Sequence, residues 1–255
     1  MRPASADPDV GPKCLSIIVP AFNEERLLAP SLAKIKKAAG VLEARGWQWE
    51  MVVCDNHSTD RTAAIAAEAG ARVVFEAINQ IGRARNRGAE AATGDWLLFV
   101  DADSQPSEEL FSRMLDGIES GRWVALGTTL QFDQVDWLFA LMAWIWKGWS
   151  VLASHMAGAF IAVNAQAFRA IEGFSLEYYV GEELDLSRRL SRWGKQQSPR
   201  QRVRVLRGVP LLTSGRKAQL YSWGESARFL GQFILSPWAT MKRKERCVIW
   251  YDGRR

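Results

Sequence analysis

Two aspartates, Asp101 and Asp103, follow directly on the apolar run Trp-Leu-Leu-Phe-Val at positions 96–100. An apolar run that stops at carboxylates is typical of a buried strand that ends at the edge of a sheet. In extended backbone, residues two apart point to the same side, so we expect the two carboxylates to converge. At about 4 Å they repel by roughly 4 kcal/mol at an effective dielectric near 20, and a hard divalent cation relieves that repulsion. The pair predicts a metal site that can also hold phosphates, and the alternative is a solvated Asp-x-Asp-Ser turn.

Alternating strands and helices are expected to position this pair. We expect strands at 15–20, 49–54, 72–75 and 96–100, and helices at 24–39, 61–69 and 82–92. This alternation predicts an α/β fold with a mostly parallel central sheet flanked by helices. Ligands bind such sheets outside the carboxyl ends of the strands. Polar groups follow three of the strands (at 20–24, at Asp55 and at Asp101 to Asp103), so we expect them at one edge.

The second half of the chain has a different composition, with a long apolar and Trp-rich stretch. We expect helices at 107–118 and 181–190, ended by Gly194, and strands at 123–128, 158–163 and 201–206. The stretch 135–163 is apolar and rich in Trp. A membrane span needs about 20 uninterrupted apolar residues, and Lys147, Gly148 and His155 interrupt this stretch. We therefore interpret it as a buried or interfacial helix followed by a strand.

Composition narrows the class of protein. The chain has 255 residues, 48% of them hydrophobic, which is enough for one large domain or two fused halves. Its net charge of +5 permits an anionic partner such as a nucleotide, a phospholipid headgroup or a nucleic acid. Cys14, Cys54 and Cys247 are scattered, which argues against a disulfide framework or a zinc site. Residues 1–13 contain no apolar segment typical of a signal peptide, so we predict a reducing, cytoplasmic location.

Five motifs occur in an order that identifies a family. The chain has neither Gly-x-Gly-x-x-Gly after its first strand nor a P-loop, so a metal and basic side chains must hold any phosphates. The chain resembles the family 2 glycosyltransferases with the A-type, nucleotide-diphospho-sugar transferase fold, from about residue 15 to residue 213. The motifs are 16–24 (SIIVPAFNE), 53–62 (VCDNHSTDRT), 82–89 (GRARNRGA), 99–103 (FVDAD) and 181–186 (GEELDL).

The resemblance implies roles on the donor side. Asp103 corresponds to the ligand of a divalent metal, Mg²⁺ or Mn²⁺, and Asp101 to its partner near the ribose. Arg83 or Arg85 is expected to touch phosphate. For the three arginines of this segment the alternative is a solvated helix face, which we prefer for Arg87. The expected nucleotide pocket comprises Pro20, Ala21, Phe22, Glu24 and Asp55, although Asp55 with its neighbour also fits a plain turn.

The resemblance also implies a general base near the start of a helix. The family places an acidic pair there, most often Glu-Asp, and its second member takes the proton from the acceptor hydroxyl. Here the pair is Glu182 and Glu183, so we expect Glu183 to be the base, with Asp185 as second candidate. The alternative is that these carboxylates complement the helix dipole. Many relatives have a downstream His as a further metal ligand; none follows His155 here, so 213–217 (TSGRK) can hold phosphate instead.

The expected function is that of an inverting, metal-assisted hexosyltransferase. The donor is a nucleotide-diphosphate sugar, with UDP favoured over GDP, and the acceptor is a glycan or a lipid-linked molecule rather than a nucleic acid. We divide the chain into a disordered tail (1–14), a nucleotide-sugar-binding half (15–128), an acceptor half of the same domain (129–215) and a helical, basic tail (216–255). Two alternatives are a non-catalytic nucleotide-sugar binder or scaffold and, less well supported by motif position, an Asp-x-Asp phosphatase.

A peripheral membrane contact at the inner face of the membrane is a further hypothesis. The aromatic stretch 135–153 and the basic residues at 242–246 would provide the contact. The alternative is that the aromatic stretch is core and the basic tail is solvated.

Overall fold

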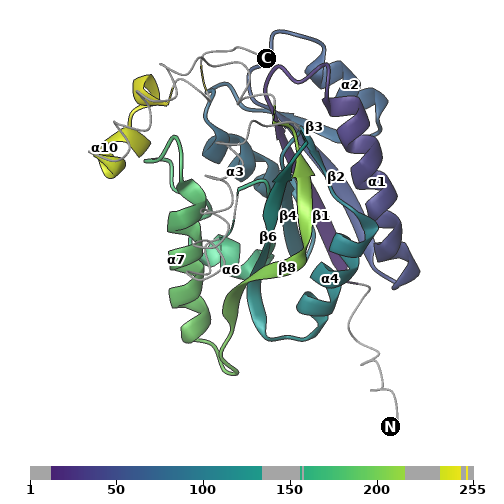
Figure 1. The fold of residues 1–255 in the computed structure, drawn as a ribbon, viewed down its shortest axis with the longest axis vertical. Helices are drawn as coiled ribbons and strands as arrows, with labels where there is room; N and C mark the ends of the chain where they lie inside the picture. The colour runs from purple at the N-terminus through teal and green to yellow at the C-terminus, as the bar shows by residue number, and fades with distance from the viewer. Residues whose placement is uncertain (1–12, 134–155, 157, 216–235, 248–250, 252–255) are drawn as a thin grey trace.

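An eight-stranded mixed sheet forms the centre of the molecule, with strand order β3-β2-β1-β4-β7-β6-β8-β5. The computed structural model describes residues 13–133, 156, 158–215, 236–247 and 251 (Figure 1). The strands are β1 (Cys14–Ala21), β2 (Gln48–Asp55), β3 (Arg72–Phe75), β4 (Trp96–Val100), β5 (Ser104–Gln105), β6 (Trp123–Phe132), β7 (Phe160–Asn164) and β8 (Arg202–Thr213).

The predicted α/β fold with a mostly parallel sheet is confirmed. Strands β3, β2, β1 and β4 are parallel neighbours, as are β6 and β8. Strand β7 runs antiparallel between β4 and β6, and β5 runs antiparallel to β8. Strands of both predicted halves therefore belong to one sheet, and the boundary placed at 128/129 lies inside β6.

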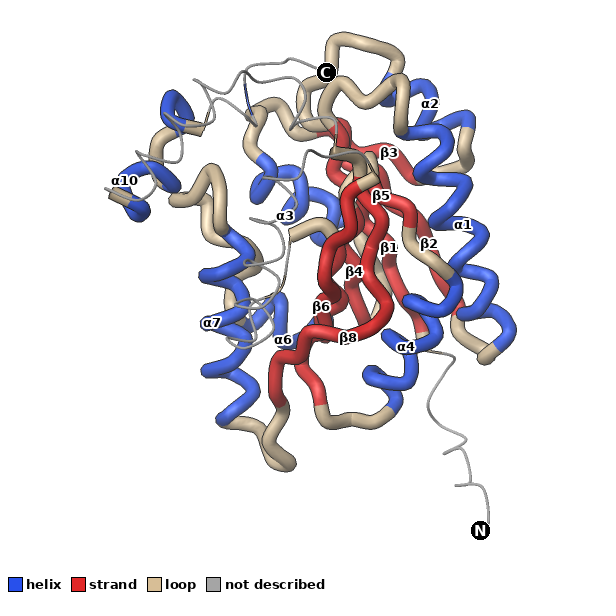
Figure 2. The backbone as a smooth tube through the Cα atoms, in the orientation of Figure 1, coloured by secondary structure: helices blue, strands red, loops and turns tan. Residues whose placement is uncertain are grey.

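Helices cover both faces of the sheet (Figures 1 and 2). Helices α1, α2 and α4 lie on one face, and α3, α6 and α7 lie on the other. The helices are α1 (Leu28–Ala44), α2 (Thr62–Glu68), α3 (Ile81–Ala91), α4 (Glu108–Glu119), α6 (Ala165–Ala170), α7 (Glu182–Lys195) and α10 (Pro237–Met241), followed by the 3₁₀ helix η1 (Lys244–Arg246).

Two apolar clusters hold these layers together. Ile17 and Leu98 point to the face covered by α1 and α4, and Ile18 and Phe99 point to the opposite face. This alternation follows from the two-residue period of a strand. Because both faces are close-packed, the ends of β1 and β4 are held in fixed positions.

Several element bounds differ from those expected. The helix expected at 24–39 begins at Leu28, because residues 24–27 form a turn in which Glu24 O accepts bonds from the amides of Leu27 and Leu28. It passes through Gly40 to Ala44. A glycine inside a helix costs only about 1 kcal/mol, and the apolar face continues to the buried Leu42. The chain turns instead at Gly46, whose φ is +74°. Helix α7 likewise passes Gly194, and β8 extends to Thr213.

Some expectations fall outside the described residues. These are residues 1–12 of the predicted N-terminal tail, the aromatic stretch 135–153 and residues 216–235 of the predicted C-terminal tail. Within the described part of the chain, no helix is both long and apolar enough to cross a membrane. The three cysteines are free thiols.

Candidate active site

A pocket open to solvent lies at the carboxyl ends of β1, β2 and β4. It is lined by Pro20, Ala21, Phe22, Glu24, Asn56, Ile81, Asp101, Ala102 and Asp103. The structure thus brings together six of the residues predicted for the donor side. The edge at which they meet is the one expected from a parallel sheet.

The two aspartates reach this pocket by a turn and not by extended backbone. Strand β4 ends at Val100, and the amide of Ser104 donates to Asp101 O at 3.1 Å. The predicted extended geometry is therefore wrong, while the predicted turn chemistry is present. Because the backbone turns here, the two carboxylates have different partners. Asp101 pairs with Arg85, and Asp103 accepts a bond from Thr213.

The loops after β1 and β2 interlock beside the pocket. Asn23 adopts a left-handed φ of 50°. Its amide donates to Ser58 Oγ at 3.0 Å, and its side-chain oxygen accepts from the amide of Thr59 at 2.8 Å. The amide of Glu24 donates to Thr62 Oγ1 at 2.8 Å. These bonds to the neighbouring loop fix the backbone of the pocket wall.

Asp55 does not line the pocket, although it was expected to face the nucleotide. Its side chain is buried, and its carboxylate accepts a bond from the amide of Ser58 at 3.0 Å. The next residue, Asn56, lines the pocket instead. Its position directly after β2 was visible in the sequence, but nothing local distinguished it from Asp55.

Asp103 is held by the end of β8. Thr213 Oγ1 donates to its carboxylate at 3.3 Å, and Ser104 Oγ donates to Thr213 Oγ1 at 3.2 Å. The described residues include no group of three or more His, Cys, Asp or Glu side chains arranged to hold a metal ion. The carboxylate of Asp103, with Asp101 in the same pocket, fits Mg²⁺ or Mn²⁺. Proteins often bind such ions through one or two carboxylates together with substrate phosphates. Thr213, the first residue of the segment 213–217 that was expected to hold phosphate, thus bonds to Asp103; residues 216 and 217 fall outside the described part.

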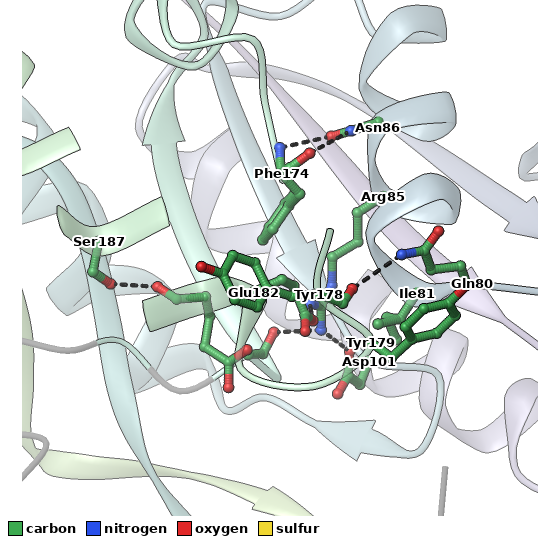
Figure 3. Close-up of polar contacts among 12 residues, drawn as sticks. Gln80, Ile81, Arg85, Asn86, Asp101, Phe174, Tyr178, Tyr179, Glu182 and Ser187 are labelled. Carbon is green, nitrogen blue, oxygen red and sulfur yellow. Dashed lines mark hydrogen bonds and ion pairs between the residues drawn. The ribbon is translucent and has the colours of Figure 1, made fainter. Parts of the chain in front are cut away.

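Arg85 has contacts that the sequence did not suggest (Figure 3). Its side chain is only 3% exposed, with Nη2 at 3.0 Å from an Asp101 oxygen and Nη1 at 2.5 Å from a Glu182 oxygen. Desolvation alone would lower the pKa of the guanidinium, but the charges of the two carboxylates outweigh it and the pKa rises. Neither Arg83 nor Arg85 belongs to the pocket lining. Arg87 is exposed and pairs with Glu90, as expected for a solvated helix face.

The acidic pair begins α7, directly after Gly181, whose left-handed φ is 80°. Glu182 is buried, and burial raises its pKa while Arg85 opposes that rise. Glu183 is half-buried. Burial and the neighbouring Glu182 charge raise the pKa of Glu183 to about 8, and the Arg85 charge limits the rise. Such a carboxyl group can take up a proton near neutral pH.

Asp185, the second candidate for the base, has a different environment. Its carboxylate accepts a bond from Arg189 Nε at 2.6 Å, one turn further along α7. The acidic first turn also complements the helix dipole, as the alternative interpretation proposed. This role accounts for a carboxylate at the position of Asp185 without any catalytic function.

Tyr251 was not anticipated at all. Its hydroxyl donates to Tyr179 O at 2.8 Å and accepts from the amide of Ile81 at 3.4 Å. Ile81 lines the pocket, and Tyr179 lies in the segment before α7. These residues are far apart in the sequence, so no local pattern could have revealed the contact.

Comparison with known proteins identifies a family. The sequence profile described as "Glycosyl transferase family 2" matches residues 16–179. The chain is 36% identical over 128 residues to the low-salt glycan biosynthesis hexosyltransferase Agl6 of Haloferax volcanii, covering 50% of this chain and 30% of that protein. It is 31% identical over 135 residues to the undecaprenyl-phosphate 4-deoxy-4-formamido-L-arabinose transferase of Edwardsiella ictaluri, covering 48% and 39%. The chain thus spans well under half the length of these curated relatives.

The fold is also shared with a solved structure. The mannosyltransferase PcManGT from Pyrobaculum calidifontis, in complex with GDP-Man and Mn²⁺, superposes with a TM-score of 0.64 at 17% sequence identity. The match covers 89% of this chain and 64% of that one. At this level of identity the likeness shows a common fold.

Proposed function

The chain belongs to glycosyl transferase family 2, and we propose that it transfers a sugar from a nucleotide-diphosphate sugar to an acceptor hydroxyl with inversion at the sugar carbon. One observation carries the proposal. Asp101 and Asp103 line a pocket, and Arg85 pairs with both Asp101 and Glu182, the residue before the half-buried Glu183, whose pKa is raised to about 8. Glycosyl transfer needs two components, a donor sugar held in position and a proton acceptor. The pocket would hold the donor, and Glu183 would accept the proton.

The donor nucleotide binds in the pocket at the ends of β1 and β2. Pro20, Ala21 and Phe22 form one wall, Asn56 continues it, and Asp101 provides a carboxylate for the ribose hydroxyls. We propose UDP as the nucleotide of the donor. The likeness to a mannosyltransferase solved with GDP-Man makes GDP the first alternative to test. The contact of Arg83 with phosphate stays a prediction.

Asp103 would hold the divalent ion. Thr213 orients its carboxylate, as neighbouring hydrogen bonds do at many metal sites. When bound, Mg²⁺ or Mn²⁺ neutralises charge on the diphosphate leaving group. The structural relative solved with Mn²⁺ supports this proposal.

Glu183 takes the proton of the acceptor hydroxyl. The acceptor oxygen forms a bond to the anomeric carbon while the bond from that carbon to the diphosphate oxygen breaks, and the nucleoside diphosphate leaves. Glu182 is less suitable because its carboxylate pairs with the buried Arg85, and protonating it would leave that cation without one of its counter-charges. Asp185 is less suitable because it pairs with Arg189 on its own helix.

The acceptor is a glycan or a lipid-linked molecule, and no described feature indicates a nucleic acid. The matched relative that uses an undecaprenyl phosphate supports the lipid-linked choice. We also propose that the protein works on the cytoplasmic side of a membrane and touches it peripherally. Arg243 is exposed next to η1, but Lys242 pairs with Glu177 and Lys244 lies over the Tyr251 ring, so fewer free cations are present than the sequence suggests.

A screen of nucleotide sugars tests the proposal. The purified protein is incubated with UDP- and GDP-sugars and Mn²⁺, and mass spectrometry follows release of the nucleoside diphosphate with and without chelator. Chelator-sensitive release from one donor class is the expected result. If the protein binds a nucleotide sugar by calorimetry but never releases the diphosphate, with water or with lipid-linked acceptors, the non-catalytic binder is the correct function.

A further inference from the structure

The pocket-lining ends of β1, β2 and β4 are called the donor edge below. Helix α3 connects this donor edge to the start of α7 through one buried cation, Arg85. Arg85 contacts groups from three segments, namely Asp101 after β4, Gly158 O before β7 and Glu182 at the start of α7. The three bonds measure 3.0, 3.0 and 2.5 Å. Figure 3 shows the side chain reaching from α3 to these carboxylates.

We propose that Arg85 is a positioning residue, which fixes Glu182 and with it the first turn of α7 against the donor-side carboxylate Asp101. The inference rests on the proposed function in one respect, because the group that this turn presents to the acceptor is Glu183. Arg85 itself touches neither donor nor acceptor.

Burial separates this role from that of a phosphate ligand. The Arg85 side chain is 3% exposed and lies outside the pocket lining, and both of its Nη atoms donate to protein oxygens. The ring of Phe174 covers it at 5.2 Å. A phosphate that displaced Glu182 from Arg85 would leave the buried Glu182 carboxylate without its counter-charge.

Gly158 places Arg85 next to Glu183 as well. A methyl group on Gly158 would lie 3.1 Å from Arg85 Nη2 and 3.5 Å from Glu183 Cδ. Arg85 and the proposed base Glu183 therefore both border the position that a side chain on Gly158 would occupy. A shift of Arg85 would change both the position and the electrostatic surroundings of Glu183.

The geometry also explains why the residue is an arginine. A planar guanidinium donates to two carboxylates and one carbonyl in fixed directions, which the single ammonium of a lysine does not. Neighbouring side chains of α3 hold the chain before α7 in the same way. Asn86 exchanges two bonds of 2.9 Å with the backbone of Phe174, and Gln80 donates to Leu176 O and Tyr178 O at 2.8 and 3.0 Å. Arg85 is the member of this group that reaches the carboxylates.

Four variants test the inference. Arg85→Met removes the cation, and Arg85→Lys keeps the charge but lacks the planar guanidinium with its several donors. The double variant Arg85→Met with Glu182→Leu replaces the buried ion pair by apolar side chains. Arg87→Met is the matched control, because Arg87 lies two residues further on the same helix and is exposed. Each variant is measured for kcat, donor KM, Mn²⁺-dependent binding of UDP or GDP, melting temperature and amide hydrogen exchange of residues 181–186.

We expect kcat of Arg85→Met to fall about 100-fold or more, the loss typical of a 1 Å misplacement of a reacting group. Nucleotide binding should change no more than about threefold, and the amides of 181–186 should exchange at least about tenfold faster. Arg85→Lys should be intermediate, and Arg87→Met should behave as the wild type. The double variant should recover the melting temperature, because apolar replacement of a buried pair is often neutral, but not kcat.

Two results would overturn the inference. One is a folded double variant with kcat within about threefold of the wild type, which would make the pair purely structural. The other is a parallel loss of nucleotide binding and kcat in Arg85→Lys, which would make Arg85 a phosphate ligand. Should Arg85→Met fail to fold, Arg85→Lys and the double variant decide. If the wild type transfers no sugar, the proposed function fails while the hydrogen-exchange measurement still decides the positioning role.

Discussion

The donor edge and the start of α7 lie next to each other, yet they are held in different ways. The donor residues follow the ends of β1, β2 and β4, and bonds between adjacent loops fix their backbone, such as those from Asn23 to Ser58 and Thr59. The acidic turn of α7 depends on side chains of α3 that lie almost a hundred residues away in the sequence, with Arg85 to Glu182 as the main link.

This difference predicts how each region tolerates change. A side-chain replacement at the donor edge leaves the strands and the interlocked loops in place, so it should remove one contact and little else. Replacing an α3 side chain that contacts Glu182 or the segment before α7, such as Arg85 or Asn86, should disturb the turn that carries Glu183, even where that side chain touches no substrate. The following predictions test that contrast, from the largest expected effect to the smallest.

Glu183→Gln should have the largest effect on catalysis. It removes the proton acceptor and keeps the shape of the side chain, so kcat should fall by about 10²- to 10⁴-fold, the range for loss of general-base catalysis. Donor binding, measured by calorimetry with Mn²⁺, should barely change because the residue lies outside the donor pocket.

Asp185→Asn is the matched control for that change. Asp185 is paired with Arg189, so its loss should reduce kcat far less than the loss of Glu183 does. If Asp185→Asn is the more damaging substitution, the assignment of the base is wrong.

The pH dependence should show the raised pKa of Glu183. The pKa of about 8 lies above the ordinary value of 4.5, so the carboxyl group is protonated at pH 6 and becomes a base only as pH rises. For donor kcat/KM, which reports the free enzyme, we expect an acidic limb near pH 8 and roughly a hundredfold loss at pH 6. A limb with a midpoint below pH 5 would contradict the assignment.

The same shift has a consequence for stability. A carboxyl group with a raised pKa in the folded state contributes stability that is fully present below pH 4.5 and is lost as pH rises through about 8. Glu183→Gln cannot ionise, so its free energy of unfolding should decline less over this window. Urea unfolding of both proteins between pH 5 and pH 9 measures the difference.

Asp103→Ala should weaken metal-dependent nucleotide binding. Loss of even an outer partner of a metal ligand typically costs about 10- to 100-fold in metal affinity, and Asp103 is the proposed ligand itself. Calorimetry with UDP and Mn²⁺ gives the affinity, and the melting temperature should stay close to that of the wild type because the change lies at a strand end. Thr213→Val, which removes the donor to Asp103, should produce a smaller loss of the same kind.

Asn86→Ala should affect stability more than donor binding. It removes both bonds between α3 and the backbone of Phe174, which leaves a partly buried amide and a carbonyl without their partners. We expect the free energy of unfolding to fall by about 1–3 kcal/mol. An equal or larger loss of nucleotide affinity would show that the donor edge also depends on α3, and the contrast between the two regions would then fail.

The smallest expected effect concerns membranes. Each basic residue near an anionic leaflet contributes about 1 kcal/mol, an attraction that salt weakens. Arg243→Gln should therefore weaken flotation with anionic vesicles, and Lys242→Gln should do so less because Lys242 already pairs with Glu177. A wild-type protein that stays in the soluble fraction with such vesicles at low salt rules the contact out.

The sequence by itself determined the alternation of strands and helices and the edge at which the donor residues meet. Both follow from local periodicity and from the rule that parallel strands place their carboxyl ends together. That is why Pro20, Ala21, Phe22 and the two aspartates were expected at the edge where they line one pocket. The five ordered motifs also identified the family, which the profile match over residues 16–179 confirms.

Only the tertiary structure decided which side chains face the pocket and which are used inside the protein. Arg85 lies among arginines of similar appearance, yet packing buries it between Asp101 and Glu182 while Arg87 stays in water. Asn56 lines the pocket while its neighbour Asp55 bonds to its own loop. These outcomes depend on contacts between segments distant in the chain, and local propensity contains no information about such contacts.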